Sequence, residues 1–141
     1  MSRLTGIIAG VALSANLAAG NGSLESLADL RWKHRIILVE QANDRTISEL
    51  AAHRAAIEER HIVWFAVVAG ELRSNYHGAL EGGLLQHLRQ DYFDRSGSPV
   101  MLIGKDGSIK SSDPSLDMGD YFARIDSMPM RQAEMARSAA D

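Results

Sequence analysis

The chain has 141 residues, a formal net charge of −3 and no cysteine. Its length and its 45% hydrophobic content suit one domain with a single core. The slightly acidic balance gives no general attraction to nucleic acid, so we expect no nucleic-acid partner. Thiol–disulfide exchange and thiol peroxidase chemistry both need a thiolate. The sequence therefore excludes both activities.

The first residues have the pattern of a secretory signal peptide. Arg3 supplies a positive charge, an apolar run extends from Ile7 to Leu17, and small residues follow at Ala18–Gly20. The run is too short for a comfortable membrane span. We expect residues 1–20 to be cleaved, the mature protein to be periplasmic or secreted, and no stable membrane span to remain. The alternative is an apolar helix that stays attached, because Asn16 and the glycines weaken the run.

The next part of the chain predicts a strand, a helix and a second strand. Arg35–Val39 is a continuous aliphatic run, which is typical of a strand buried on both faces. Thr46 with Glu49 fits a capping box that opens a helix. The apolar run His61–Val68 then predicts a second strand, parallel to the first and joined to it by a right-handed crossover.

A loop, a helix and a third strand are expected next. Gly70–Gly83 is glycine-rich and polar, which indicates a loop. Apolar residues recur at helical spacing over Leu84–Tyr92 and predict a helix that returns across the sheet. Ser98–Ile103 reads as a strand, with a proline where no ladder donor is needed.

The last predicted elements are a hairpin and a helix. Asp106 and Gly107 are typical of a tight two-residue turn, followed by a short antiparallel strand at Ile109–Lys110. Asp117 can cap a helix, and Pro129 should end or bend it. The order β-α-β-α-β-β-α, with a mixed central sheet and a C-terminal hairpin and helix, is that of a thioredoxin-like three-layer α/β sandwich. We expect one domain over residues 24–137 and a tail over 138–141.

Three local strings stand out: Leu30–Arg35, Gly104–Gly107 with Lys110, and Ile125–Arg131 with Glu134 and Met135. They resemble the P-DUDES domain, a bacterial domain-of-unknown-function family that also occurs in some animal extracellular-matrix proteins. The resemblance covers roughly residues 24–137. It implies a thioredoxin-like fold related in shape to peroxiredoxins and implies no established activity.

Thioredoxins carry their redox pair just after the first buried strand, and this resemblance locates the equivalent position. Gln41–Thr46 occupies it here and contains no thiol. Ser98 and Pro99 resemble the cis-proline step that faces the redox site, so we predict a cis bond between them. These segments would line the former active-site cleft and are the first expected place for ligand contacts.

Basic residues cluster around an aromatic residue before the first strand: Arg31, Trp32, Lys33, His34 and Arg35. Such a cluster could hold a phosphate, a carboxylate or an acidic partner segment. The structural alternative is that the arginines pair with acids of the same domain, for example Asp126, while Trp32 fills the core.

Two further hypotheses arise near the C-terminus. Asp126, Arg131 and Glu134 could be an acid, an anion clamp and a base of an enzyme, with His34 contributing, or they could pair locally and fix a helix onto the sheet. Soft thioether ligands could bind copper, or the same side chains could be core filler; they are Met128, Met130 and Met135, around Pro129.

The remaining motifs point to no chemistry of their own. Lys105, Asp106 and Gly107 superficially resemble a phosphate loop, but hairpin geometry explains them. The histidines lack zinc-ligand spacing. We therefore expect no catalytic residue, cofactor or metal ion, and a non-catalytic module that binds an unknown protein or envelope partner. The alternatives are a cysteine-independent enzyme and a soft-metal carrier.

Overall fold

The structure is a computed structural model that describes residues 23–140, so the expected signal peptide at 1–20 lies outside the described residues. A five-stranded mixed sheet in the order β4-β3-β2-β5-β6 forms its centre. β2 and β3 are parallel, as expected, and the other neighbouring strands are antiparallel. The strands are β2 (Arg35–Ala42), β3 (Ile62–Val68), β4 (Glu71–Ser74), β5 (Val100–Ile103) and β6 (Ile109–Asp113).

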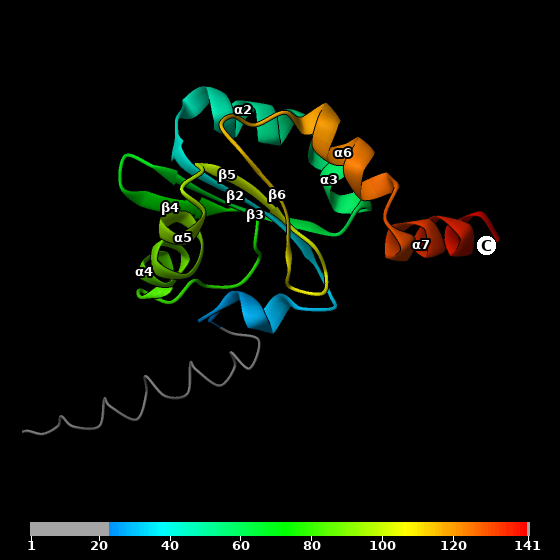
Figure 1. Ribbon diagram of the computed structural model, residues 1–141, viewed down its shortest axis with the longest axis horizontal. Coiled ribbons are helices and arrows are strands. Elements are labelled where there is room, and N and C mark those ends of the chain that lie inside the picture. The colour runs from blue at the N-terminus through cyan, green and yellow to red at the C-terminus, as the bar shows by residue number, and fades with distance from the viewer. Residues whose placement is uncertain (1–22, 141) are drawn as a thin grey trace, which may run out of the picture.

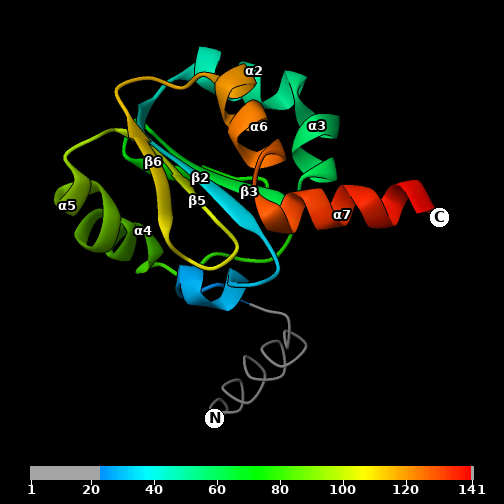
Figure 2. The same ribbon diagram turned by 45° about the vertical axis from the view of Figure 1, so that its right-hand side comes forward.

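Helices cover both faces of the sheet, which gives a mixed α/β fold (Figure 1). One face carries α2 (Asp44–Ala52), α3 (Arg54–Glu59) and α6 (Met118–Asp126). The other carries the 3₁₀ helix η2 (Leu27–Leu30), α4 (Leu84–Leu88), the π-helical turn η3 (Arg89–Phe93) and α5 (Asp94–Ser96). The last helix, α7 (Pro129–Ala140), extends from one end of the sheet (Figure 2) and includes most of the expected tail.

The sheet is buried on both faces because its central strands alternate between two apolar clusters. Ile36 and Leu38 of β2 pack with η2, α4 and η3, whereas Ile37 and Val39 pack with α2, α3 and α6. Successive side chains of a strand point to opposite faces, so an uninterrupted aliphatic run supplies both. The apolar runs predicted as central strands are confirmed on this basis.

The crossover helix begins earlier than predicted. Asn43, rather than Thr46, is its N-cap: the Asn43 side chain accepts from the Thr46 backbone at 3.0 Å, and Thr46 Oγ1 accepts in return from the Asn43 backbone at 3.3 Å. A capping box joins the N-cap to the third helical residue, so Thr46 occupies the second position of the box and not the first. His53 then separates α2 from α3.

The expected loop at Gly70–Gly83 is wrong in its first part, because β4 lies there. Ala69 and Gly70 form a two-residue turn with φ of 50° and 80°, and Val68 pairs with Glu71 across it. Positive φ at both positions is typical of the type I′ hairpin turn. The domain therefore has an extra edge strand that the predicted order β-α-β-α-β-β-α lacks.

The predicted cis bond before Pro99 is also wrong, since no peptide bond in residues 23–140 is cis. The Pro99 carbonyl accepts from the Glu40 backbone at 2.7 Å, and Val100 follows directly in register with Val39. The extended trans chain thus leads straight into β5.

The C-terminal hairpin is present but has a longer loop than predicted. Gly104 donates its backbone N–H to Ser108 at 2.9 Å, and Gly107 donates to Gly104 at 3.0 Å. Gly107 has a φ of 87°, whereas Asp106 is not left-handed. This pattern is that of a three-residue loop with one left-handed glycine. Further along, the Asp117 side chain caps α6 as predicted, and Pro129 starts α7 after the expected break.

Candidate binding site

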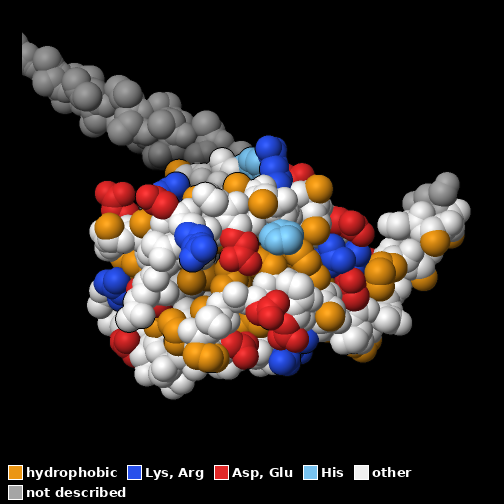
Figure 3. All heavy atoms as spheres, turned by 90° about the horizontal axis from the view of Figure 1, so that it is seen from above, with side chains coloured by type: hydrophobic (Ala, Val, Ile, Leu, Met, Phe, Trp, Pro, Cys, Tyr) orange, Lys and Arg blue, Asp and Glu red, His pale blue; other side chains and the backbone are white. Residues whose placement is uncertain are grey.

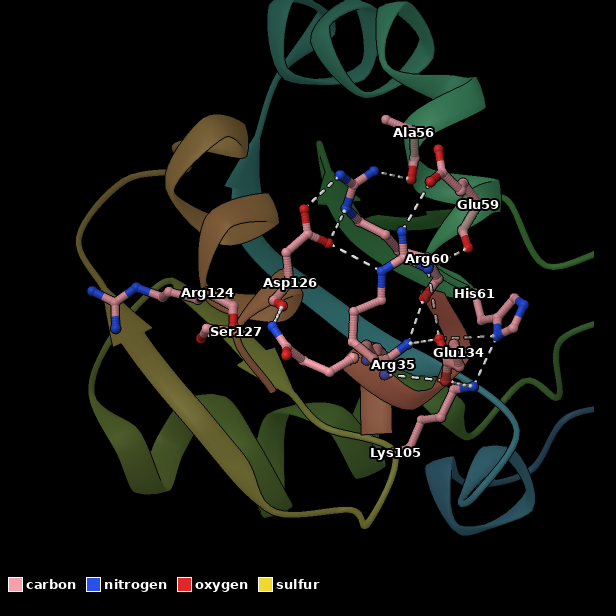
Figure 4. A network of polar contacts seen from close by, with 12 residues as sticks. Arg35, Ala56, Glu59, Arg60, His61, Lys105, Arg124, Asp126, Ser127 and Glu134 are labelled. Carbon is pink, nitrogen blue, oxygen red and sulfur yellow. Dashed lines mark hydrogen bonds and ion pairs between the residues drawn. The ribbon is translucent and has the colours of Figure 1, made fainter. Parts of the chain in front are cut away.

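Buried charged side chains meet at the end of the sheet where β2 and β3 begin (Figure 4). Arg35 is the first residue of β2 and is only 1% exposed. Lys105 comes from the β5–β6 loop, and Arg131 and Glu134 come from α7; all three are buried. Charged groups are rarely buried unless they are paired, so the partners of each define the site.

Glu134 is the first centre of this network. Arg35 donates to both of its carboxylate oxygens, at 3.1 and 3.2 Å, and Lys105 Nζ donates to Oε2 at 2.6 Å. Burial by itself would raise the pKa of Glu134, but these hydrogen bonds and charges outweigh it and lower the pKa to about 2. Glu134 is therefore ionised at neutral pH, and it fastens α7 to the sheet.

Asp126 is the second centre. Arg60 donates to its two oxygens at 3.1 and 2.9 Å, and Arg131 donates to Oδ1 at 3.0 Å. Arg131 also donates to the Glu59 carboxylate at 2.9 Å. The Arg60 hydrogen bond is the main cause of a lowered pKa at Asp126. These contacts place Asp126 beside arginines other than those of the basic cluster at 31–35.

Together these groups carry one more positive than negative charge. The cations Arg35, Arg60, Lys105 and Arg131 face the carboxylates of Glu59, Asp126 and Glu134. Arg131 and Glu134, which the sequence paired locally, are 3.8 Å apart, and each makes shorter contacts elsewhere. Because the acids and bases satisfy one another, the arrangement is suited to holding elements together rather than to proton transfer.

His61 lies at the edge of this network, and its backbone is unusual. Its φ of 53° is left-handed, which is uncommon for a residue other than glycine. Its Nδ1 lies 2.8 Å from Lys105 Nζ. An ammonium group can only donate, so Nδ1 accepts and the ring proton is on Nε2. Burial, followed by the charge of Lys105, lowers the pKa of His61, and the ring is neutral at pH 7.

Pockets lie on either side of His61. The smaller, of about 220 Å³, is lined by Glu59, Arg131, Glu134 and Met135 as well as His61. The larger, of about 460 Å³, lies along the first residues of β3. Its size is within the usual range of roughly 300–1,000 Å³ for ligand sites.

Both faces of the sheet contribute to the larger pocket. Leu50 and Ile57 belong to the cluster under α2 and α3, whereas Val63 and Tyr76 belong to or pack against the opposite cluster. The pocket therefore wraps around the open edge of β3 instead of entering one layer. Its walls are mainly apolar, and its polar groups include three histidines and Asn75: the histidines are His34, His61 and His77.

His34 is a candidate residue of the basic cluster that does reach this pocket. Among the described residues its buried Nδ1 has no hydrogen-bond partner. Burial is the main cause of a lowered pKa at His34; coupling to the titrating His61 ring and the positive charges of Lys105 and Lys33 lower the pKa further. His34 therefore presents a neutral imidazole to the pocket wall, with its unpartnered Nδ1 buried.

The rest of the basic cluster lies outside the pocket. Trp32 is 62% exposed and has a φ of 69°, so the expectation that it fills the core is wrong. Its backbone N–H donates to the Lys105 carbonyl at 2.6 Å, which holds it on the β5–β6 loop instead. Arg31 lies against Gly107, where a Cβ would be 2.8 Å from its guanidinium.

The segment expected to correspond to a thioredoxin redox site, Gln41–Thr46, lies at the other end of the sheet. Gln41 and Pro99 are adjacent there, because Glu40 hydrogen-bonds Pro99, but neither they nor Ser98 lines the two pockets above. The three methionines do not share one environment either. Met128 packs against the core, Met130 is exposed and Met135 lines the smaller pocket.

Sequence reasoning missed four residues that build the site. Glu59, Arg60 and His61 follow one another at the end of the crossover, and their clustering before a buried strand was an available signal. The sequence carries no such signal for Asn75, because the role of this residue depends on where β4 turns away from β3.

Membrane crossing, metal binding and surface charge can also be judged from the described residues. Within residues 23–140, no helix is both long and apolar enough to cross a membrane. Over that same stretch, no group of three or more His, Cys, Asp or Glu side chains could hold a metal ion. Charged side chains of both signs are interspersed over the face that α2, α3 and α6 cover (Figure 3).

Comparison with known proteins assigns the chain to a family without assigning an activity. No curated protein and no solved structure matches it significantly. A family described as "Domain of unknown function (DUF4174)" matches residues 26–134, a range that runs from just before η2 to Glu134. This range covers most of the chain and includes both the sheet and the charged network, and the protein therefore belongs to the DUF4174 family of domains of unknown function.

Proposed function

We propose that the protein is an exported, thioredoxin-like binding module that holds a protein or envelope partner in the larger pocket and catalyses no redox reaction. The pocket of about 460 Å³ at the β3 edge carries this proposal. The order of parallel strands followed by a hairpin and helix, the resemblance to P-DUDES and the lack of cysteine support the rest.

Binding fits the chemistry of the site better than catalysis does. Asp126, Arg131 and Glu134 form ion pairs within the charged network, and none of them lines the larger pocket. His61 is fixed as a donor at Nε2 by Lys105, and a general base would need a free acceptor nitrogen there. What the pocket offers a ligand is an apolar wall with a few polar contacts.

The test uses the position of the two tryptophans. Trp64 lines the pocket and Trp32 is exposed elsewhere, so a Trp32→Phe variant leaves one tryptophan that reports on the pocket. The full chain is screened by thermal shift against peptides, small anions and metal salts. A compound that raises the melting temperature should then change Trp64 fluorescence with saturation.

A blocking variant and a matched control decide where the ligand binds. Ala51 is exposed on α2 and lines the pocket, whereas Ala52 is exposed on the same helix and does not. Ala51→Phe should weaken binding at least about tenfold, and Ala52→Phe should leave it unchanged. Equal binding to both variants, or no stabilising compound at all, would contradict the proposal.

A further inference from the structure

The edge of β3 is only partly covered by β4. Pairing between the two strands extends from Val68 and Glu71 to Phe65 and Ser74 and ends there. The preceding residues of β3, Ile62–Trp64, pair with β2 on one side. On the other side lies the larger pocket, which opens where the chain after β4 diverges.

A single side chain takes the place of a strand at this edge. The Asn75 amide oxygen accepts from the Trp64 backbone N–H at 2.8 Å, and its nitrogen donates to the Ile62 carbonyl at 3.1 Å. An amide group offers the same acceptor and donor as a peptide bond. Asn75 therefore satisfies the two backbone groups that a neighbouring strand would otherwise bond.

From this edge we infer that the pocket takes an extended peptide segment with an acidic side chain, which displaces the Asn75 amide and pairs with β3. This inference rests on the proposed function. A peptide strand would supply the bonds that Asn75 gives up, so no buried backbone group is left unpaired. Its alternate side chains would meet Ile62 and Trp64 on one face and Val63 and Tyr76 on the other.

Charge favours an acidic residue at the His34 and His61 end. Lys105 lies directly behind His61, and the network there carries one excess positive charge. Lys33 and Lys105 also place positive charge near His34. At the rim, Arg54 and Glu58 pair with each other at 3.1 Å and leave this balance unchanged. A carboxylate would find N–H donors and a positive field here.

A random hexapeptide library with acetylated N-termini and amidated C-termini tests the inference against the full chain. We expect enrichment of one Asp or Glu flanked by β-branched or aromatic residues. For the best peptide, amidation of the acid should weaken binding at least threefold, and N-methylation of one alternate set of backbone amides should weaken it at least tenfold. A second library with free C-termini serves as the comparison. Binders from that library alone, with none from the amidated one, would show recognition of a terminal carboxylate and overturn the inference.

Variants at Asn75 test the displacement itself. Asn75→Ala removes the competing amide, so the peptide should bind about tenfold tighter, in line with the usual value of one or two hydrogen bonds. Gln86→Ala, at an exposed position of α4 that lines neither pocket, should not alter affinity. If Asn75→Ala does not fold, the displacement can still be tested in the parent protein, because its Asn75 side-chain amide resonances should move on binding.

The outcomes separate this inference from the proposed function. Enriched peptides that are basic, that tolerate N-methylation everywhere or that leave the Asn75 resonances unmoved would overturn strand pairing. A non-peptide ligand that changes Trp64 fluorescence, with no peptide enriched, would overturn the inference and leave the proposed function standing. Failure of every probe would remove both.

Discussion

Glu134 joins α7 to the sheet through two buried cations, and its removal should be costly. In Glu134→Gln, Arg35 and Lys105 stay buried without a full counter-charge. We expect the free energy of unfolding to fall by about 3–5 kcal/mol, the usual effect of breaking a buried ion pair. Urea denaturation measures it. Glu58→Gln, in the exposed pair with Arg54, should change stability by less than about 0.5 kcal/mol.

The same carboxylate makes stability depend on pH in the acid range. The pKa of Glu134 is about 2 in the folded protein and roughly 4.3 in an unfolded chain. The lowered pKa stabilises the fold fully above about pH 5, and this contribution, on the order of 3 kcal/mol, is lost as pH falls toward 2. Denaturation midpoints between pH 6 and 2.5 should fall more steeply for the parent than for Glu134→Gln. Parallel curves would contradict this assignment.

Sequence reasoning reached individual residues of the site but not their pairing. Arg35, Asp126, Arg131 and Glu134 all stood out as charged residues in unusual strings. Arg35 and Glu134 are 99 positions apart, and nothing local in either string shows that they meet. Trp32 was misplaced for the opposite reason: an aromatic residue before a strand suggests burial, but the left-handed turn directs it outward.

At the level of elements, the β3–β4 turn offers a direct test. Ala69 has a φ of 50°, a conformation that costs a residue with a Cβ about 1 kcal/mol and suits asparagine better. Ala69→Asn should therefore raise the free energy of unfolding by roughly 0.5–1 kcal/mol. Ala55→Asn, on exposed α3, should lower it by a few tenths because asparagine is the poorer helix former. A loss of stability in Ala69→Asn would contradict the turn geometry.

That turn also shows why β4 escaped prediction while the central strands did not. Buried strands are long aliphatic runs, which few other elements resemble. β4 has four residues, includes Glu71 and Arg73, and follows a turn without the usual asparagine. Its position at the edge of the sheet needs only a half-buried pattern, so the sequence carries almost no signal. The position of the larger pocket depends on where β4 ends, so the pocket could not be predicted from the sequence either.

For the whole molecule, export is a prediction that the described residues do not test. The chain begins with a positive residue, an apolar run and small residues, in that order, and this pattern should direct secretion in a bacterial host. We expect the mature protein in the periplasmic or extracellular fraction, with its N-terminus just after Ala19 or Gly20. N-terminal sequencing of the fractionated protein decides this. An uncleaved chain in the cytoplasmic fraction would contradict it.

The central claim is that a ligand binds at the open edge of β3 and not at Gln41–Thr46, the segment expected to correspond to a thioredoxin redox site. A ¹H–¹⁵N titration of the full chain with the tightest ligand from the screens tests it most directly. We predict the largest shifts at the backbone amides of Ile62–Trp64 and at Asn75–His77, around the larger pocket. Shifts concentrated instead at Gln41–Thr46 and Val100, at the opposite end of the sheet, would contradict the account.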